Sequence, residues 1–126
     1  MKPDIENRAD IENLMNTFYD KVKVDDILGP VFNVQIPVNW EVHLPVMYQF
    51  WENAIFYTGG YTGNPMAVHE HIHKKIGLKS AQFDRWIELF NQTTDELFEG
   101  EKANLAKQRA LSIAKVMEHK ILTPIA

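Results

Sequence analysis

The sequence of 126 residues contains no cysteine, which excludes disulfide bonds, thiolate metal sites, iron–sulfur clusters and cysteine nucleophiles. Basic residues are fewer than acidic ones: the chain has 13 Lys and Arg residues and 17 Asp and Glu residues, which gives a formal net charge of −4. This balance argues against binding to nucleic acid or to an anionic membrane surface. No apolar run approaches the length of a membrane-spanning helix, and the polar amino terminus lacks the apolar core of a signal peptide. We therefore expect a cytoplasmic protein.

Strand patterns, internal repeats and low-complexity tracts are missing as well, and helical periodicity takes their place. Four main helices are predicted over residues 8–24, within 40–57, from Ser80 to the Glu99-Gly100 stop, and from about Glu101 to Ile121. A further short helix is predicted from Pro65 to about Lys75, after a glycine-rich loop. Helices of this number in a chain of this length predict one all-α domain over residues 1–126, built around a single core.

The first helix is the most regular, because its apolar residues follow one helical face. Asn7 can cap its start, with Asp10 three residues later in capping-box spacing. The residues expected on the buried face are Ile11, Leu14, Met15, Phe18, Tyr19 and Val22. Considered alone, Tyr19 is interpreted as a tyrosine at the edge of the core whose hydroxyl reaches water.

The second helix carries His43 at the head of an apolar face that continues through Met47, Phe50 and Trp51. Pro45 complicates its start, because a proline inside a helix clashes with the carbonyl four residues earlier. Either the helix effectively starts near Leu44, or its first turn is distorted. A lone histidine in such a place is usually a satisfied or half-exposed residue.

Three of the five histidines, His69, His71 and His73, fall within five residues of one another, just before an aromatic-rich segment. Neutral imidazole is a common metal ligand. On a helix His69 and His73 share a face and His71 points nearly the opposite way, so at most two of them can serve one site. The aromatic segment that follows contributes Phe83 and Trp86.

Two kinds of metal site fit these residues. A haem pocket needs a slot lined by bulky apolar and aromatic side chains and a single axial imidazole. A zinc or non-haem iron site built on His69 and His73 needs a third and usually a fourth ligand, and the sequence offers one Glu-x-x-His pair, Glu70 with His73, without a second. Haem is favoured; a non-haem metal protein and a haem-free helical interaction module are the alternatives.

An ordered set of motifs resembles the truncated haemoglobins, and more narrowly their group III. The set consists of FYDKV at 18–22, LGPVF at 28–32, the spacing from His43 to Phe50-Trp51, Y-x-G-x-P at 61–65, and H-x₉-F-D-R-W at 73–86. The resemblance covers about residues 10–121. It implies a two-over-two helical sandwich, haem b as the cofactor, and binding of O₂ and other diatomic ligands such as NO and CO.

The resemblance also implies roles for individual residues. The spacing to the Phe-x-x-Trp motif selects His73 as the iron ligand. His69 is the alternative, because it fits the spacing from the Y-x-G-x-P motif and the chain has a longer insert between the two motifs. Tyr19 and Trp86 match the donors that contact the bound ligand, and His43 matches the distal histidine that acts as a gate. The other residues expected around the haem are Phe32, which packs on its plane, Met47, Phe50, Phe83 and Met117. Candidate partners of the haem propionates are Lys74, Lys75 and Arg85.

The donors have a physical rationale of their own. Bound O₂ carries partial negative charge, and Tyr O–H and Trp N–H groups can both donate to it. A buried neutral hydrogen bond contributes about 1 kcal/mol and a charge-assisted one about 1.5–3 kcal/mol, so two donors slow ligand release by roughly two to three orders of magnitude. Slow release suits ligand chemistry better than O₂ delivery. It leaves room for NO detoxification or peroxidase-like turnover with an unidentified reductase.

Overall fold

The computed structural model describes residues 2–31, 39–57 and 80–122, without the side chains of residues 117 and 119–122. The described residues form four α-helices, which confirms the prediction of four main helices. These are α1 (Arg8–Val24), α2 (Trp40–Phe56), α4 (Ser80–Leu97) and α5 (Glu101–Leu122). The short helix predicted over 65–75 lies outside the described residues. None of the helices in the described part is long and apolar enough to cross a membrane.

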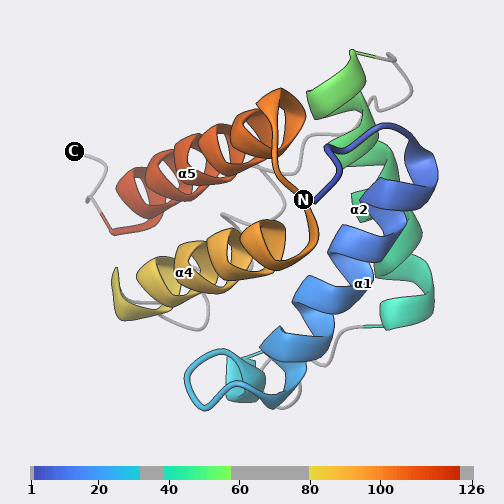
Figure 1. Cartoon of the computed structure of the whole chain (residues 1–126). Helices are drawn as coiled ribbons and strands as arrows, with labels where there is room; N and C mark the ends of the chain where they lie inside the picture. The colour runs from blue at the N-terminus through green and yellow to red at the C-terminus, as the bar shows by residue number, and fades with distance from the viewer. Residues whose placement is uncertain (1, 32–38, 58–79, 123–126) are drawn as a thin grey trace.

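The helices pack as two antiparallel pairs. In Figure 1, α1 and α2 form one pair, and α4 and α5 form the other, with a tight turn between them. The pairs meet where α1 packs on α4 and α2 on α5. This arrangement is the predicted all-α two-over-two sandwich. The expectation of a single domain over residues 1–126 stays a prediction.

Helix α1 follows its sequence pattern closely. All six residues expected on its apolar face are buried. The Asn7 side chain accepts a hydrogen bond from the Asp10 backbone N–H at 3.0 Å, and the Asp10 carboxylate accepts one from the Glu6 N–H at 2.8 Å. Such a cap stabilises a helix by about 1 kcal/mol. The helix places Tyr19, which lies near its carboxyl end, against the opposite helix pair.

Helix α2 begins at Trp40, so a start near Leu44 is wrong, and Pro45 lies inside the helix. The Asn39 carbonyl accepts from the N–H groups of both Val42 and His43, at 3.1 and 2.9 Å. Within the described residues the Asn39 side chain adds no capping bond. The bond that Pro45 cannot make would go to the carbonyl of Glu41, a residue exposed in the first turn. The helical turn before the proline therefore stays intact and fixes His43.

The second pair is drawn together by small residues. The α5 residues facing the core include Ala103, Ala106, Ala110 and Ala114, which are all buried. On α4, Phe83 and Phe90 are buried, and so are two polar residues, Thr93 and Thr94. Their hydroxyls donate to the carbonyls of Leu89 and Phe90, at 2.7 and 2.9 Å. Each hydroxyl is thus satisfied within its own helix.

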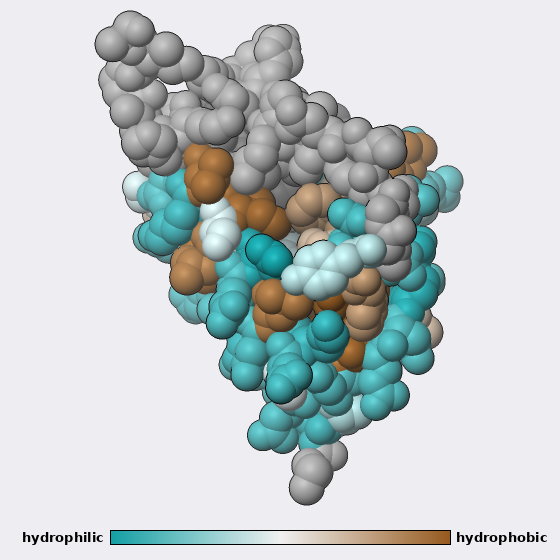
Figure 2. Space-filling view, turned by 90° about the horizontal axis from the view of Figure 1, so that it is seen from above, coloured by the Kyte–Doolittle hydropathy of each residue, from teal (hydrophilic) through white to brown (hydrophobic). Residues whose placement is uncertain are grey.

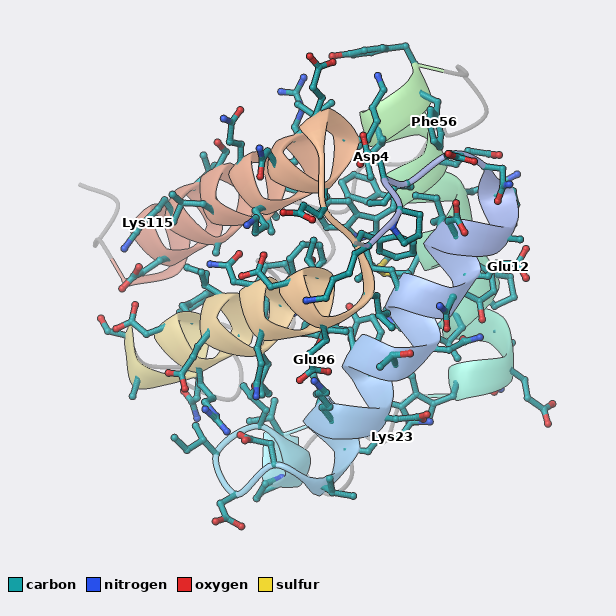
Figure 3. The ribbon with its side chains drawn as sticks, viewed as in Figure 1. Asp4, Glu12, Lys23, Phe56, Glu96 and Lys115 are labelled. Carbon is teal, nitrogen blue, oxygen red and sulfur yellow. The ribbon has the colours of Figure 1, made fainter. Side chains whose placement is uncertain are left out.

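The residues before α1 cross the turn between α4 and α5. The Asp4 carboxylate accepts from the backbone N–H groups of Lys102 and Ala103, at 2.9 and 2.8 Å, and so caps the start of α5. Figure 3 labels Asp4 at this junction. Gly100 lies beneath it with a φ of 142°, and a Cβ there would come within 2.6 Å of the Asp4 carboxyl carbon. We refer to Asp4 and these two N–H groups as the Asp4 cap.

Candidate functional site

A hydrogen bond between Tyr19 of α1 and Trp86 of α4 is the centre of the site. The bond joins the two side chains, and because an indole N–H can only donate, the Tyr19 oxygen accepts it. Tyr19 is 5% exposed. Burial raises the pKa of Tyr19 to about 12, against the smaller opposing effect of the Trp86 hydrogen bond. The hydroxyl therefore keeps its proton across the physiological range, and a hydroxyl that accepts can also donate.

Aromatic rings hold Trp86 in place. Its ring packs edge-on against Phe18, with centroids 5.5 Å apart, and stacks on Phe90 at 5.6 Å. Phe90 in turn stacks on Trp51 of α2 at 4.9 Å. Offset-stacked and edge-to-face pairs of this kind add about 0.5–1.5 kcal/mol each beyond the area they bury. The indole donor is consequently fixed from three helices.

His43 lies beside Tyr19. Their ring centroids are 5.8 Å apart and the rings are nearly perpendicular, at 81°. The histidine is half-buried, and burial lowers its pKa from the ordinary value of 6.5. The imidazole is thus neutral at neutral pH, with one nitrogen to donate and the other to accept. The structure brings together all three residues predicted on the ligand side, Tyr19, His43 and Trp86.

Trp40 is a member of this cluster that the sequence analysis did not single out. Its ring lies 5.2 Å from that of Tyr19 and 5.6 Å from that of His43. The Lys23 ammonium sits 4.7 Å above its centroid, on the outer side of the cluster. One signal could have identified it: Trp40 precedes His43 by three residues, a spacing that puts both on one helical face.

The remaining predicted pocket residues fall into two groups. Met47 and Phe83 are buried, and Phe50 is half-buried with its ring 5.5 Å from Trp51. Their role as pocket walls stays a prediction. The others lie outside the described residues or side chains, and they are Phe32, Met117, His73 and its alternative His69.

Arg85 makes ion pairs within the protein, and its candidate role beside a haem propionate stays a prediction. Its guanidinium binds the Asp25 carboxylate, with Nε and Nη2 each 2.8 Å from Oδ1, and also reaches Glu88 on its own helix. The hydrogen bond to Asp25 raises the pKa of Arg85. Lys74 and Lys75, the other propionate candidates, lie outside the described residues.

The donor set suits a small ligand with partial negative charge inside an apolar surrounding, which is what the distal side of a haem requires. Figure 2 shows hydrophobic side chains gathered toward the middle of one face, with hydrophilic ones toward its lower edge. Across residues 2–31, 39–57 and 80–122, no three His, Asp or Glu side chains are grouped so as to hold a metal ion. The non-haem alternative built on His69 and His73 stays a prediction, because both residues lie outside the described part of the chain.

No family model matches the chain. Over 124 residues it is 30% identical to group 3 truncated haemoglobin ctb of Campylobacter jejuni, an alignment that spans 96% of this chain and 95% of that protein. The fold is similar to the crystal structure of the group III truncated haemoglobin from Campylobacter jejuni. That match has a TM-score of 0.81 and 28% identity, and covers 96% of this chain and 95% of the other. The chain belongs to the group III truncated haemoglobins, and membership of this family implies a haem-binding globin.

Proposed function

We propose that this globin binds haem b through His73 and holds O₂, NO or CO on the side where Tyr19 and Trp86 lie. The observation that carries the proposal is the buried Trp86–Tyr19 hydrogen bond, which joins two side chains that each offer a neutral donor.

When bound, haem supplies an iron that takes up a diatomic ligand and can exchange electrons. The chain's own part is to orient donors. Trp86 donates to the Tyr19 oxygen and so limits the rotation of the hydroxyl, which can direct its own proton at a ligand. Because the pKa of Tyr19 is raised to about 12, that proton is present at every physiological pH. Such a donor slows ligand release roughly tenfold per hydrogen bond.

His43 and Trp40 close the site toward solvent in this proposal. His43 is neutral, so it can swing without first losing a charge, and its nearly perpendicular contacts with Tyr19 and Trp40 define one closed position. Met47, Phe50 and Phe83, with Phe32 and Met117, supply the apolar walls that keep water away from the ligand. Exclusion of water strengthens each donor, because hydrogen bonds gain strength in a low dielectric.

Redox turnover is a finer part of the proposal. NO detoxification or peroxidase-like chemistry would use the slow release of ligand and would require an unidentified reductase. The support is the donor set itself, which favours retention over exchange of a ligand. Comparison of NO consumption with and without an added electron donor is the direct assay.

The first experiment is an absorption spectrum of the purified protein, before and after addition of hemin, dithionite and CO. A strong Soret band that shifts on reduction and again with CO is the expected result. A flat spectrum after hemin addition would sink the haem proposal. Metal analysis by mass spectrometry would then separate a His69–His73 metal site from a haem-free module.

The iron ligand is tested by a matched pair of variants. His73→Ala is expected to lose haem or bind it far more weakly, whereas His71→Ala, two residues away, is expected to bind it normally. Hemin titration followed at the Soret band measures both. Loss of haem in His71→Ala with retention in His73→Ala would show that the predicted helical register is wrong.

A further inference from the structure

One ion pair joins the residue before Trp86 to the residue that follows the helix of Tyr19. Arg85 directly precedes Trp86 in α4, and Asp25 directly follows α1, six residues after Tyr19. The Arg85 guanidinium places two nitrogens, each 2.8 Å away, on the same oxygen of Asp25. The pair therefore joins the end of the helix that carries Tyr19 to the start of the helix that carries Trp86.

Asp25 is held firmly enough to serve as an anchor. Its side chain is 5% exposed. While Oδ1 binds Arg85, Oδ2 accepts from the backbone N–H groups of Ile27 and Leu28, both at 3.0 Å. The Asp25 carbonyl also accepts from Gly29 at 2.8 Å. Burial acts to raise the pKa of Asp25, but these hydrogen bonds outweigh it and lower the pKa, so the carboxylate stays charged.

We propose that Arg85 and Asp25 are positioning residues for the distal donors: their ion pair sets the distance between α1 and α4 at which Trp86 reaches Tyr19. The inference deepens the proposed function and rests on it for its effect on ligand release. Charge-assisted pairs with a buried, fully engaged partner are the strong ones. A change of a fraction of an ångström in this spacing would lengthen the indole–hydroxyl bond, whose strength falls with distance and angle.

The cavity over this pair does not itself suggest a ligand. It is lined by Lys21, Asp25, Asp26 and Arg85 with two apolar residues. Arg85 is already bound to Asp25 and Glu88, and Lys21 to Glu96 at 2.7 Å. Three of the four charged lining residues, Lys21, Asp25 and Arg85, are thus paired inside the protein, which points to a structural use.

The Lys21–Glu96 pair provides a matched control. It too links α1 to α4, but Glu96 lies ten residues beyond Trp86, near the other end of the helix, and is 48% exposed. In Figure 3, Glu96 is labelled on α4 on the side facing α1. If any α1–α4 ion pair served equally, Glu96→Gln would act on the site as Arg85→Gln does. If position matters, the two variants differ.

The experiment compares the wild type with Arg85→Gln, Arg85→Lys, Asp25→Asn and Glu96→Gln. The first readout is the ¹⁵N–¹H resonance of the Trp86 indole in the reduced, CO-saturated protein, assigned with Trp86→Phe. In Arg85→Gln and Asp25→Asn we expect it to move upfield and to exchange faster with solvent. Arg85→Lys keeps the positive charge, so its indole resonance should move less than that of Arg85→Gln. Glu96→Gln should leave the resonance in place.

The second readout is the O₂ release rate. The O₂ release rate of Arg85→Gln should be at least about threefold higher than that of the wild type, which corresponds to the partial loss of one hydrogen bond. In a Tyr19→Phe background the same change should have little further effect, because the two act through one contact. A residue that merely stabilises the fold would add its effect in both backgrounds.

The outcomes distinguish a failure of the positioning role from a failure of the proposed function. An indole resonance unmoved in Arg85→Gln and Asp25→Asn, or moved as much in Glu96→Gln, would overturn the positioning role. If Tyr19→Phe and Trp86→Phe themselves leave the release rate unchanged, the proposed distal site fails. The indole measurement does not depend on that result, so it still decides whether the ion pair holds Trp86.

Discussion

Two of the places where polar atoms join segments far apart in the chain, the Asp4 cap and the Tyr19–Trp86 pair, differ in the chemistry of those atoms. In the Asp4 cap, a carboxylate that can only accept is occupied by backbone N–H groups at the start of α5. In the Tyr19–Trp86 pair, a hydroxyl that accepts from the indole is also a donor by its nature. The first arrangement is complete as a structural device. The second offers hydrogen-bonding capacity suited to a ligand.

The largest effect on stability is expected at Gly100, beneath the Asp4 cap. Gly100→Ala places a Cβ within 2.6 Å of the Asp4 carboxyl carbon, on a backbone with a φ of 142° that L residues rarely adopt. Strain of this kind costs about 1–3 kcal/mol before the clash is counted. We expect the free energy of unfolding to fall by about 3 kcal/mol, as measured by urea denaturation.

Ligand release in Gly100→Ala should match the wild type, because the Asp4 cap does not touch the donors. Ala106→Gly, a buried position further along α5, gives a comparison in which the helix is weakened at a residue outside the Asp4 cap. An altered release rate in Gly100→Ala would mean that the two regions are coupled.

Asp4→Ala is expected to cost about 2 kcal/mol, since hydrogen bonds to a charged acceptor contribute about 1.5–3 kcal/mol and a cap about 0.5–2 kcal/mol. Asp4→Asn, which keeps an acceptor oxygen but not the charge, should lose less. Because Gly100 and Asp4 share one contact, their double variant should be less destabilised than the sum of the two. Strict additivity would mean that the methyl group added by Gly100→Ala does not act through Asp4.

The Asp4 cap also predicts a pH dependence. Burial acts to raise the pKa of Asp4, but hydrogen bonds from the backbone N–H groups of Lys102, Ala103 and Ile5 lower it below the ordinary 3.8. A lowered folded-state pKa adds stability above the unfolded-state value, and this is lost as the pH falls through the folded-state value. The stability difference between wild type and Asp4→Ala should therefore be constant above pH 5 or so and shrink below about pH 4. A difference that persists in strong acid would contradict the carboxylate's role.

Tyr19→Phe is expected to act in the opposite way to the changes at the Asp4 cap: it should change the ligand release rate strongly and the free energy of unfolding only slightly. Loss of one donor should speed O₂ release about tenfold, equivalent to about 1.4 kcal/mol, as measured by stopped flow. Tyr48→Phe is the control, since the Tyr48 hydroxyl donates to Asn16 at the surface. An unchanged rate in Tyr19→Phe would remove Tyr19 from the distal network.

How far the sequence predicts this molecule depends on how locally each feature is encoded. The α1 face and the Asn7 cap are periodic or adjacent in sequence, and both were predicted correctly. Two alternatives were left open for the start of α2, and the start near Leu44 is wrong, because it weighed Pro45 without the exposed turn that precedes it. The pairing of Arg85 with Asp25 was not predicted, because Asp25 lies 60 residues away and only tertiary structure brings the two together.

The candidate site illustrates the same limit. Tyr19, His43 and Trp86 were predicted together because a family resemblance supplied what periodicity could not, and the structure brings the three together. Trp40 has no motif of its own, and its role follows from where α2 begins. The predicted iron ligand His73 lies outside the described residues, so its role stays a prediction.

The smallest expected effect is at Trp40, a half-buried aromatic of the cluster. Trp40→Phe keeps an aromatic ring near Tyr19 and His43 but shortens it beneath the Lys23 ammonium, which lies 4.7 Å from the Trp40 centroid. A cation–π contact at an exposed site contributes about 0.5–1 kcal/mol, so we expect CO association and release to change by about two- to fivefold. Phe98→Leu, at a buried aromatic outside this cluster, should instead lower stability and leave these rates near the wild type. If Trp40→Phe leaves both rates unchanged, Trp40 belongs with the structural contacts, and closure of the site rests on His43 alone.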